Sequence, residues 1–259
     1  MRYEKCFRIF LKNQGYKMSV KINKKIYNKF SKEYHKELLR ENYWHRYIEK
    51  PAISSLLRDI VKNKKVLDLG CGSGIFSNEI STRWRAEVTG IDLSNGLIKI
   101  AEENYPKINF FVGNAQKTPF KDNSFDVITS SLMIHYFKNL RPLFKEVSRI
   151  LKRRGIFVFS MHHPIKEVIH KLNIKRIKGS LFTSYFNNDK YIWTLHNRLT
   201  LVSYHHTFEA IIEALYETGF YIERLLEPVS LKAGKKKNKK MYERSINRPT
   251  FLVIRAVKR

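Results

Sequence analysis

The stretch KKVLDLGCGSGIFSNEI, residues 64–80, constrains the fold of this 259-residue chain more than any other feature. An apolar run reaches a turn with glycines at positions 70, 72 and 74 and leads into a helical pattern. The chain must therefore pass sharply from a buried strand into a helix, as it does around nucleotide-type cofactors. Ile75 stands where a dinucleotide fingerprint requires its third glycine, which disfavours a pyrophosphate ligand.

Strand and helix patterns alternate after this turn. Seven apolar segments predict strands, and they read KVLDLG, EVTGID, INFFVGNA, FDVITSSL, GIFVFSM, YIERLLEP and TFLVIRAVK. Helical patterns separate most of them, in IFSNEISTRW, LIKIAEENY, LRPLFKEVSRIL and TFEAIIEALYETGF. Because apolar strands in such alternation form parallel sheets covered on both faces, we predict an α/β fold. It should be Rossmann-like, with a seven-stranded, mostly parallel sheet.

The other segments read as additions to a single domain, 1–259. Residues 1–50 predict a basic extension followed by a helical lid, because apolar and aromatic residues recur at helical spacing from residue 22 onward. Residues 165–206 are too long for a plain loop and predict an inserted cap after the fifth strand. The cap is rich in aromatic residues, namely Phe182, Tyr185, Phe186, Tyr191, Trp193 and Tyr204. Residues 232–248 predict a lysine-rich loop.

The formal net charge is +27, and residues 1–29 and 232–248 carry much of it. Two interpretations stay open, a solubility and codon-bias effect or a polyanionic partner. No run of about 18 apolar residues exists, so we expect no membrane partner. With only two cysteines, Cys6 and Cys71, a disulfide framework is not expected, which favours a location in the reducing cytoplasm. Met1 and Met18 both stay open as the natural start.

Polar residues follow three of the predicted strands. Asp68 precedes the glycines, where a carboxylate repels phosphate but suits an ammonium- or sulfonium-bearing amino-acid tail. Asp92 follows about 20 residues later, where a carboxylate can accept both hydroxyls of a ribose. Asn114 and Ala115 follow the next strand, beside the expected position of an adenine. The glycine turn and these residues together predict a nucleoside cofactor with a charged tail.

In this order and spacing, VLDLGCGSG, GIDLS, GNAQKTPFKDNSFDVITSSLMIHY and EVSRILKRRGIFVFSMHHP resemble class I S-adenosylmethionine-dependent methyltransferases of the small-molecule, type 11-like kind. The resemblance runs from about Tyr34 to the C-terminus and implies S-adenosyl-L-methionine as the cofactor. It implies that the cofactor is bound by Asp68, Gly70, Cys71, Gly72, Asp92, Leu93, Asn114, Ala115, Ser131, Tyr34 and Trp44. The family usually has Asp where this chain has Asn114. For Tyr34 and Trp44, ordinary helix packing is the alternative to a lid over the cofactor.

Several kinds of methyl transfer are disfavoured. A nucleophilic cysteine near the fourth strand, an Asn- or Asp-Pro-Pro motif and paired glutamates are all missing there, which argues against cytosine-C5, base-amine and arginine methylation. His163 and His205 match a small-molecule subgroup and are candidate general bases, because histidine titrates near neutrality. The alternative is that both histidines are structural. The histidine spacing does not predict a metal site.

We therefore predict an enzyme that transfers a methyl group from S-adenosylmethionine to an O or N atom of a small organic acceptor. A tRNA or rRNA methyltransferase that uses the basic segments is the first alternative. A non-catalytic S-adenosylmethionine-binding protein is the second, since a fold does not fix a function. The sequence names neither the acceptor nor the oligomeric state.

Overall fold

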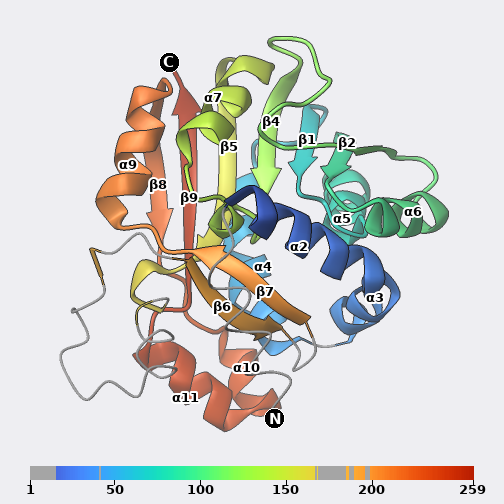
Figure 1. Ribbon diagram of the computed structural model, residues 1–259. Coiled ribbons are helices and arrows are strands. Elements are labelled where there is room, and N and C mark those ends of the chain that lie inside the picture. The colour runs from blue at the N-terminus through green and yellow to red at the C-terminus, as the bar shows by residue number, and fades with distance from the viewer. Residues whose placement is uncertain (1–15, 41, 167, 169–184, 187–189, 196–198) are drawn as a thin grey trace.

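The computed structural model describes residues 16–40, 42–166, 168, 185–186, 190–195 and 199–259. Seven strands form one sheet in the order β3-β2-β1-β4-β5-β9-β8 (Figure 1). They are β1 (Lys65–Leu69), β2 (Glu87–Asp92), β3 (Asn109–Val112), β4 (Phe125–Ser130), β5 (Leu151–His162), β8 (Phe220–Leu226) and β9 (Phe251–Lys258). Strand β9 is antiparallel to β5 and β8, and the other neighbours are parallel. The predicted Rossmann-like sheet is confirmed.

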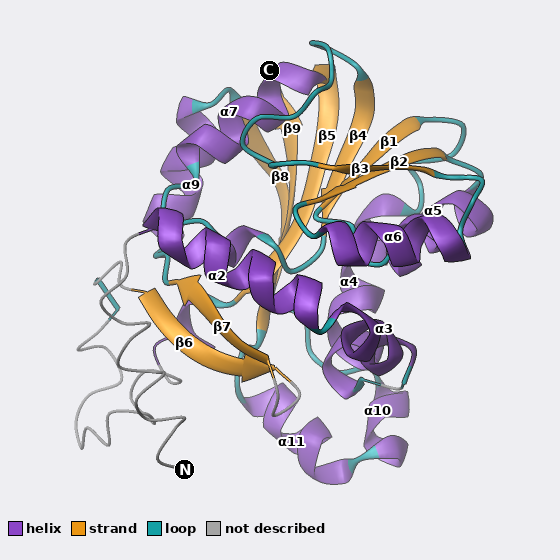
Figure 2. Cartoon of the chain, turned by 45° about the vertical axis from the view of Figure 1, so that its right-hand side comes forward, coloured by secondary structure: helices purple, strands orange, loops and turns teal. Residues whose placement is uncertain are grey.

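Helices cover both faces of the sheet (Figure 2). Helices α4 (Lys50–Leu57), α5 (Ile75–Trp84) and α6 (Asn95–Asn104) pack on one face. Helices α7 (Arg141–Ile150) and α9 (Phe208–Glu217) pack on the other. Helix α7 buries Leu143, Phe144, Val147 and Ile150, which share one side of the helix because they are spaced at three and four residues. None of the described helices is long and apolar enough to cross a membrane.

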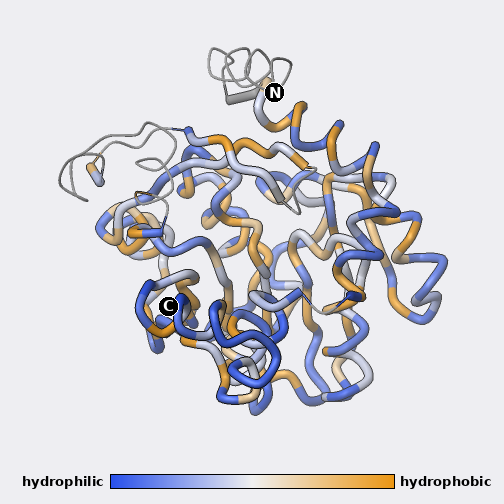
Figure 3. Tube along the Cα trace, turned by 90° about the horizontal axis from the view of Figure 1, so that it is seen from below, coloured by the Kyte–Doolittle hydropathy of each residue, from blue (hydrophilic) through white to orange (hydrophobic). Residues whose placement is uncertain are grey.

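The N-terminal helices lie over the carboxyl ends of the strands. They are α2 (Tyr16–Lys29), α3 (Ser31–Leu39) and the π-helix η1 (His45–Glu49). Helix α2, which leaves the N-terminal trace in Figure 3, alternates hydrophobic and hydrophilic stretches. The helical pattern breaks after α3, because Asn42 Oδ1 accepts hydrogen bonds from Trp44 N and His45 N and starts a new helical segment. Residues 1–15 lie outside the described part.

The predicted cap contains a hairpin of β6 (Lys190–Leu195) and β7 (Leu199–Tyr204), which pair antiparallel apart from the main sheet. Helix α2 is tied to this hairpin. Asn23 Nδ2 donates to Val202 O at 2.8 Å, and Val202 N donates back to Asn23 Oδ1 at 3.0 Å. Tyr204 Oη also donates to Ser19 Oγ at 3.0 Å, so hydrogen bonds join the lid to the cap at more than one position. Phe182 and most of 167–189 lie outside the described residues.

Residues 232–248 differ from the predicted loop. They form helices α10 (Lys232–Lys237) and α11 (Lys239–Asn247), inserted between β8 and β9. Asn238 caps α11 by accepting a hydrogen bond from Met241 N at 3.0 Å. Met241 and Tyr242 pack against the buried cluster of Tyr43, Ile48 and Phe251. A tertiary contact with η1, which the local lysine pattern does not show, therefore stabilises the helices.

Candidate active site

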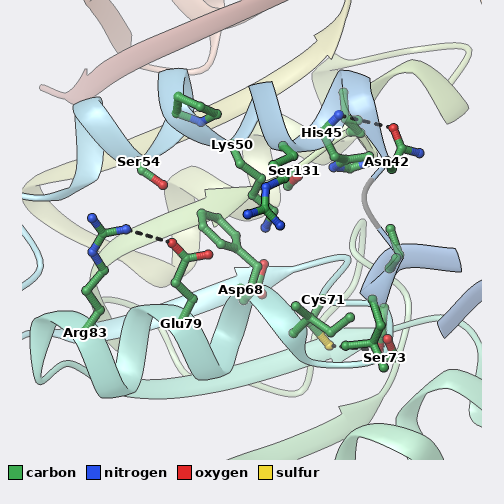
Figure 4. A pocket seen from close by; sticks show the side chains of 18 of the residues that line it. Asn42, His45, Lys50, Ser54, Asp68, Cys71, Ser73, Glu79, Arg83 and Ser131 are labelled. Atoms are coloured by element: carbon green, nitrogen blue, oxygen red, sulfur yellow. Dashed lines mark hydrogen bonds and ion pairs between the residues drawn. The ribbon is translucent and has the colours of Figure 1, made fainter. Parts of the chain in front are cut away.

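Two adjoining cavities open where the carboxyl ends of β1, β2 and β4 meet. The β2-side cavity, of about 500 Å³, lies between these strand ends and α2. The α4-side cavity, of about 770 Å³, lies between α4 and α5 (Figure 4). Both are lined by Tyr34, Gly70, Gly72, Ser131 and Leu132, so they meet beside the glycine turn.

The glycine turn brings bare backbone to this junction. Gly70 has φ of +80°, and a Cβ atom there would lie 2.6 Å from Met133 Cγ. Gly72 has φ of +56°, and its N–H donates to Asp92 Oδ2 at 3.0 Å. A Cβ on Gly72 would meet nothing nearer than Tyr34, at 3.8 Å. Glycine is thus required by packing at position 70 and by backbone conformation at both positions.

Asp92 ends β2 and lines the β2-side cavity. Besides the bond from Gly72, it accepts one from Ser94 N to Oδ1 at 2.8 Å. Burial raises the pKa of this carboxyl, and the backbone hydrogen bonds from Ser94 and Gly72 oppose the rise. Each oxygen keeps a second lone pair, so the carboxylate suits two adjacent hydroxyl groups of a ligand.

Leu93, Asn114 and Ala115 line the same cavity beyond Asp92. Asn114 Oδ1 accepts a hydrogen bond from Gln116 N at 3.0 Å. Its amide group can therefore donate into the cavity, where a carboxylate could only accept. This arrangement suits an unprotonated ring nitrogen, with Leu93 and Ala115 as apolar neighbours.

Asp68 lies at the floor of the α4-side cavity, near Lys50 (Figure 4). Its side chain is buried, and Oδ2 accepts a hydrogen bond from Ser77 Oγ at 2.6 Å. Burial raises the pKa of this carboxyl to about 6, against the opposing effects of Ser77 and Lys50. A buried carboxylate of this kind favours a cationic ligand group, which would restore part of its lost solvation.

Lys50, at the start of α4, supplies a cation on the other side of the same cavity. Its ammonium lies 3.3 Å from the ring centroid of Phe76 and makes no hydrogen bond or ion pair with any described residue. Burial lowers its pKa, while the charges of Glu49, Glu79 and Asp68 raise it. The α4-side cavity therefore offers both a carboxylate and an unpaired ammonium, which complement the zwitterion of an amino acid.

Glu49 fixes the wall between η1 and the sheet. Its Oε1 accepts hydrogen bonds from Ser160 Oγ at 2.6 Å and Ser131 Oγ at 2.8 Å. Its Oε2 lies 3.3 Å from Nδ1 of His45, which lines the α4-side cavity. Burial by itself raises the pKa of Glu49, but His45, Lys50 and Ser160 outweigh it and lower the pKa to about 2. The buried charge holds Ser131 at the junction of the cavities.

Helix α2 roofs the β2-side cavity. Tyr27 on α2 and Tyr136 after β4 share a hydrogen bond of 2.7 Å between their hydroxyl groups, and both line the cavity. Burial raises the pKa of both phenols, so they stay neutral hydrogen-bonding groups. Together with the α2–β7 hydrogen bonds and those that Asn28 Oδ1 accepts from Ser94 Oγ and Gly96 N, this bond holds α2 over the cavity.

Comparisons with known proteins agree with this geometry. Residues 67–159 match the family described as methyltransferase domain. An uncharacterised protein of Haemophilus influenzae is 30% identical over 235 residues, which cover 82% of this chain and 87% of that protein. A solved S-adenosylmethionine dependent methyltransferase from Mesorhizobium loti is 26% identical, with a TM-score of 0.64 over 81% of this chain and 97% of that one. The chain belongs to the class I S-adenosylmethionine-dependent methyltransferases.

As a member of this family, the methyltransferase is an enzyme whose cofactor is S-adenosylmethionine. The demethylmenaquinone methyltransferase of Chlorobaculum tepidum is 33% identical over 142 residues, which cover 54% of this chain and 58% of that enzyme. The chain thus matches little more than half of that relative. The carboxylate of Asp68 would repel a phosphate group, whereas it would attract the ammonium of a sulfonium amino acid.

Ten of the eleven residues expected to bind the cofactor line one or both cavities. They are Tyr34, Asp68, Gly70, Cys71, Gly72, Asp92, Leu93, Asn114, Ala115 and Ser131. Trp44 lines neither. It packs in the cluster with Tyr43 and carries the guanidinium of Arg244 over its ring, at 5.7 Å from the centroid. For Trp44 the packing alternative describes the structure, because η1 turns its indole toward α11.

The two histidines expected as general bases also lie outside the lining of both cavities. His163 Nε2 is 2.6 Å from Glu227 Oε1, and its Nδ1 accepts a hydrogen bond from Ile165 N. His205 Nε2 lies 2.7 Å from Tyr185 O. Both side chains are fully buried in these contacts. The geometry favours the structural interpretation of each histidine, since ring nitrogens that bind neighbours are not presented to a ligand.

Lys50 and Glu49 were not identified from the sequence. They are the two residues before Pro51, in an amphipathic stretch where charged residues usually face solvent. The one signal in the sequence was Asn42, which can cap a new helix and so turn the residues after it, including Glu49 and Lys50, in a new direction. No group of three or more His, Cys, Asp or Glu side chains suited to a metal occurs among the described residues.

Proposed function

We propose that S-adenosylmethionine spans both cavities, with its nucleoside in the β2-side cavity and its amino-acid tail in the α4-side cavity. The carboxylate of Asp92 would accept the ribose hydroxyls, and the Asn114 amide would donate to the adenine between Leu93 and Ala115. Asp68 would face the ammonium of the tail and Lys50 its carboxylate. The charges support this direction, because Asp68 and Lys50 both line the α4-side cavity, whereas the carboxylate of the β2-side cavity, Asp92, is already bound by Gly72 N and Ser94 N.

We further propose that the acceptor is a small organic molecule that binds in the β2-side cavity beneath α2. The observation that supports this proposal is the cover that α2 forms over the cavity. Tyr27 and Tyr136 bridge across the cavity at 2.7 Å, and Met133 and Phe137 add apolar wall. A roofed, largely apolar space with a few hydroxyl groups suits a small molecule better than a nucleic-acid duplex.

The cofactor supplies an activated methyl group, so the protein's task is alignment and the exclusion of water. The backbone of the glycine turn would determine how deeply the cofactor enters the cavities. Ser131, held by Glu49, lies at the junction where the two halves of the cofactor would meet. The neutral hydroxyls of Tyr27 and Tyr34 can orient a polar group of the acceptor, because burial keeps both phenols protonated.

The relatives differ in their acceptors and leave the reacting atom unspecified. Besides the demethylmenaquinone enzyme, a malonyl-[acyl-carrier protein] O-methyltransferase from Legionella pneumophila is 30% identical over 108 residues. The expectation of an O or N atom rested on His163 and His205, whose ring nitrogens contact other parts of the protein. The proposal therefore rests on the cavity and names a small organic acceptor.

Purified enzyme incubated with methyl-labelled cofactor and a cell extract tests the proposal. The extract is divided beforehand into small molecules, lipids, RNA and protein. Label in the small-molecule or lipid fraction, as a discrete product, is the expected result. Label confined to RNA or to protein would contradict it. Tyr27→Phe serves as a matched variant, because it removes the hydroxyl bridge and keeps the ring.

A further inference from the structure

The α10–α11 helix pair carries a concentrated positive charge. Lys232, Lys235, Lys236, Lys237, Lys239, Lys240 and Arg244 are all exposed, and we call them the basic helical face. The pair contains a single acid, Glu243, whose Oε1 lies 3.9 Å from Lys239 Nζ. Seven cations against one carboxylate leave this face with a strong excess charge, which attracts an anionic surface.

The basic helical face is held rigidly beside the active site. Leu231 N donates to Tyr47 O at 2.9 Å, and Tyr43 Oη lies 2.8 Å from Ser230 Oγ. Gly234 packs so closely that a Cβ atom there would lie 2.7 Å from Tyr43 Oη. Since Tyr43 and Tyr47 belong to the segment that carries Glu49 and Lys50, the charged helices have a fixed position relative to the α4-side cavity.

Exposed aliphatic side chains lie among these charges. Leu39 is 62% exposed and Leu231 is 49% exposed, and both line the α4-side cavity together with the exposed Arg40 and Arg46. Val229, two residues before Leu231, is 56% exposed. The mouth of the cavity thus combines leucines with arginines, next to a row of lysines. Mixed aliphatic and cationic surfaces of this kind partition into the interface of an anionic bilayer.

We propose that the basic helical face, with Val229, Leu231 and Leu39, docks on a lipid bilayer that carries anionic headgroups. The lysines would contact the headgroups, and the aliphatic side chains would enter the acyl boundary. An RNA partner is less well matched, because bound bases stack on exposed aromatic rings, and the exposed apolar side chains here are aliphatic. The sequence led us to expect no membrane partner because it lacks a spanning segment. Surface docking needs no such segment, and it does not depend on the identity of the acceptor.

Co-sedimentation of the full chain with vesicles tests the proposal. We expect binding to vesicles of phosphatidylglycerol and phosphatidylcholine, little binding to phosphatidylcholine alone, and release at high salt. Each lysine near an anionic surface is worth about fivefold in partitioning. The combined substitutions Lys235→Gln, Lys236→Gln, Lys239→Gln and Lys240→Gln should therefore lower partitioning several hundredfold, roughly. Val229→Ser should lower it by up to about tenfold, through lost apolar burial.

A matched control removes the same charge from the opposite edge of the sheet. Lys62, Lys64, Lys107 and Lys121 are exposed near the amino ends of β1, β3 and β4, and changing all four to Gln should leave vesicle binding within about twofold. Binding of S-adenosylhomocysteine checks that each variant is folded. Three results would overturn the proposal: no sedimentation with anionic vesicles, an equal loss in the control, or charge-dependent binding to an RNA oligonucleotide without binding to vesicles. Since no assay here uses methyl transfer, a wrong acceptor class would not affect the outcome.

Discussion

Asp68→Asn is the sharpest test of the charge pattern in the α4-side cavity. Burial raises the pKa of Asp68 from 3.8 to about 6. Between these values the folded protein binds more protons than the unfolded chain, so stability is highest at low pH and falls as the pH rises through this range. A difference of about two pKa units corresponds to about 3 kcal/mol of unfolding free energy. This is the cost of keeping Asp68 ionised in the folded protein.

Asparagine has the same shape and can still accept the hydrogen bond from Ser77, but it does not ionise. Above about pH 7, the free energy of unfolding of the variant should exceed that of the wild type by up to about 3 kcal/mol. Near pH 4, where Asp68 is mostly protonated, the two proteins should unfold alike. Urea unfolding at both pH values measures the difference.

The same variant should bind the cofactor less well. Losing the charged partner of the ammonium should weaken S-adenosylhomocysteine binding about 10- to 100-fold, because a charge-assisted hydrogen bond is worth about 1.5–3 kcal/mol. Methylthioadenosine, which lacks the tail, should bind as before, and calorimetry measures both ligands. Asp126→Asn is the control. The Asp126 carboxylate accepts hydrogen bonds from Lys152 Nζ and Lys65 N, which lower its pKa despite its partial burial. Removing this charge should therefore destabilise the protein above about pH 4. The reasoning fails if Asp68→Asn is less stable than the wild type above about pH 7 or binds S-adenosylhomocysteine normally.

Three other variants test the remaining contacts. Lys50→Met keeps the contact with the Phe76 ring face, and calorimetry should show an S-adenosylhomocysteine affinity about 10- to 100-fold lower. An equal loss of methylthioadenosine affinity would show that Lys50 does not bind the amino-acid tail. Asn23→Ala removes both hydrogen bonds to Val202, so amide exchange across α2 should quicken, and unchanged exchange would mean that the roof is held elsewhere. His163→Gln should lower the unfolding midpoint because it breaks the contact between the buried His163 ring and Glu227, while kcat per folded enzyme stays within about twofold. A collapse of kcat with the fold intact would restore His163 as a general base.

The core of the fold could be predicted because its signals are local. The helix expected from IFSNEISTRW is α5, Ile75–Trp84, and the first two strands lie where the apolar runs place them. A period of two or of 3.6 residues, together with a glycine turn, is written in consecutive residues. The carboxyl ends of parallel strands meet at one edge of a sheet, so Asp68, Asp92 and Asn114 were brought together as soon as the order of the strands was known.

The sequence could not show which distant side chains face each other. His163 and His205 have the chemistry of a base, but their ring nitrogens contact Glu227 and Tyr185, which are 64 and 20 residues away along the chain. Lysines 232–240 suggested a loop, yet the packing of Gly234 on Tyr43 places two helices there.

The amino-acid sequence by itself determined the sheet, the glycine turn and the meeting of Asp68, Asp92 and Asn114 at one end of the sheet, because periodicity and turn chemistry act over a few residues. The tertiary structure decided where Glu49 and Lys50 lie. Glu49 and Lys50 lie beside the α4-side cavity because α4 packs against β5 and β9 and η1 packs against β9, and their surroundings then set their pKa values. Desolvation depends on everything that surrounds a side chain, so no local pattern reveals it.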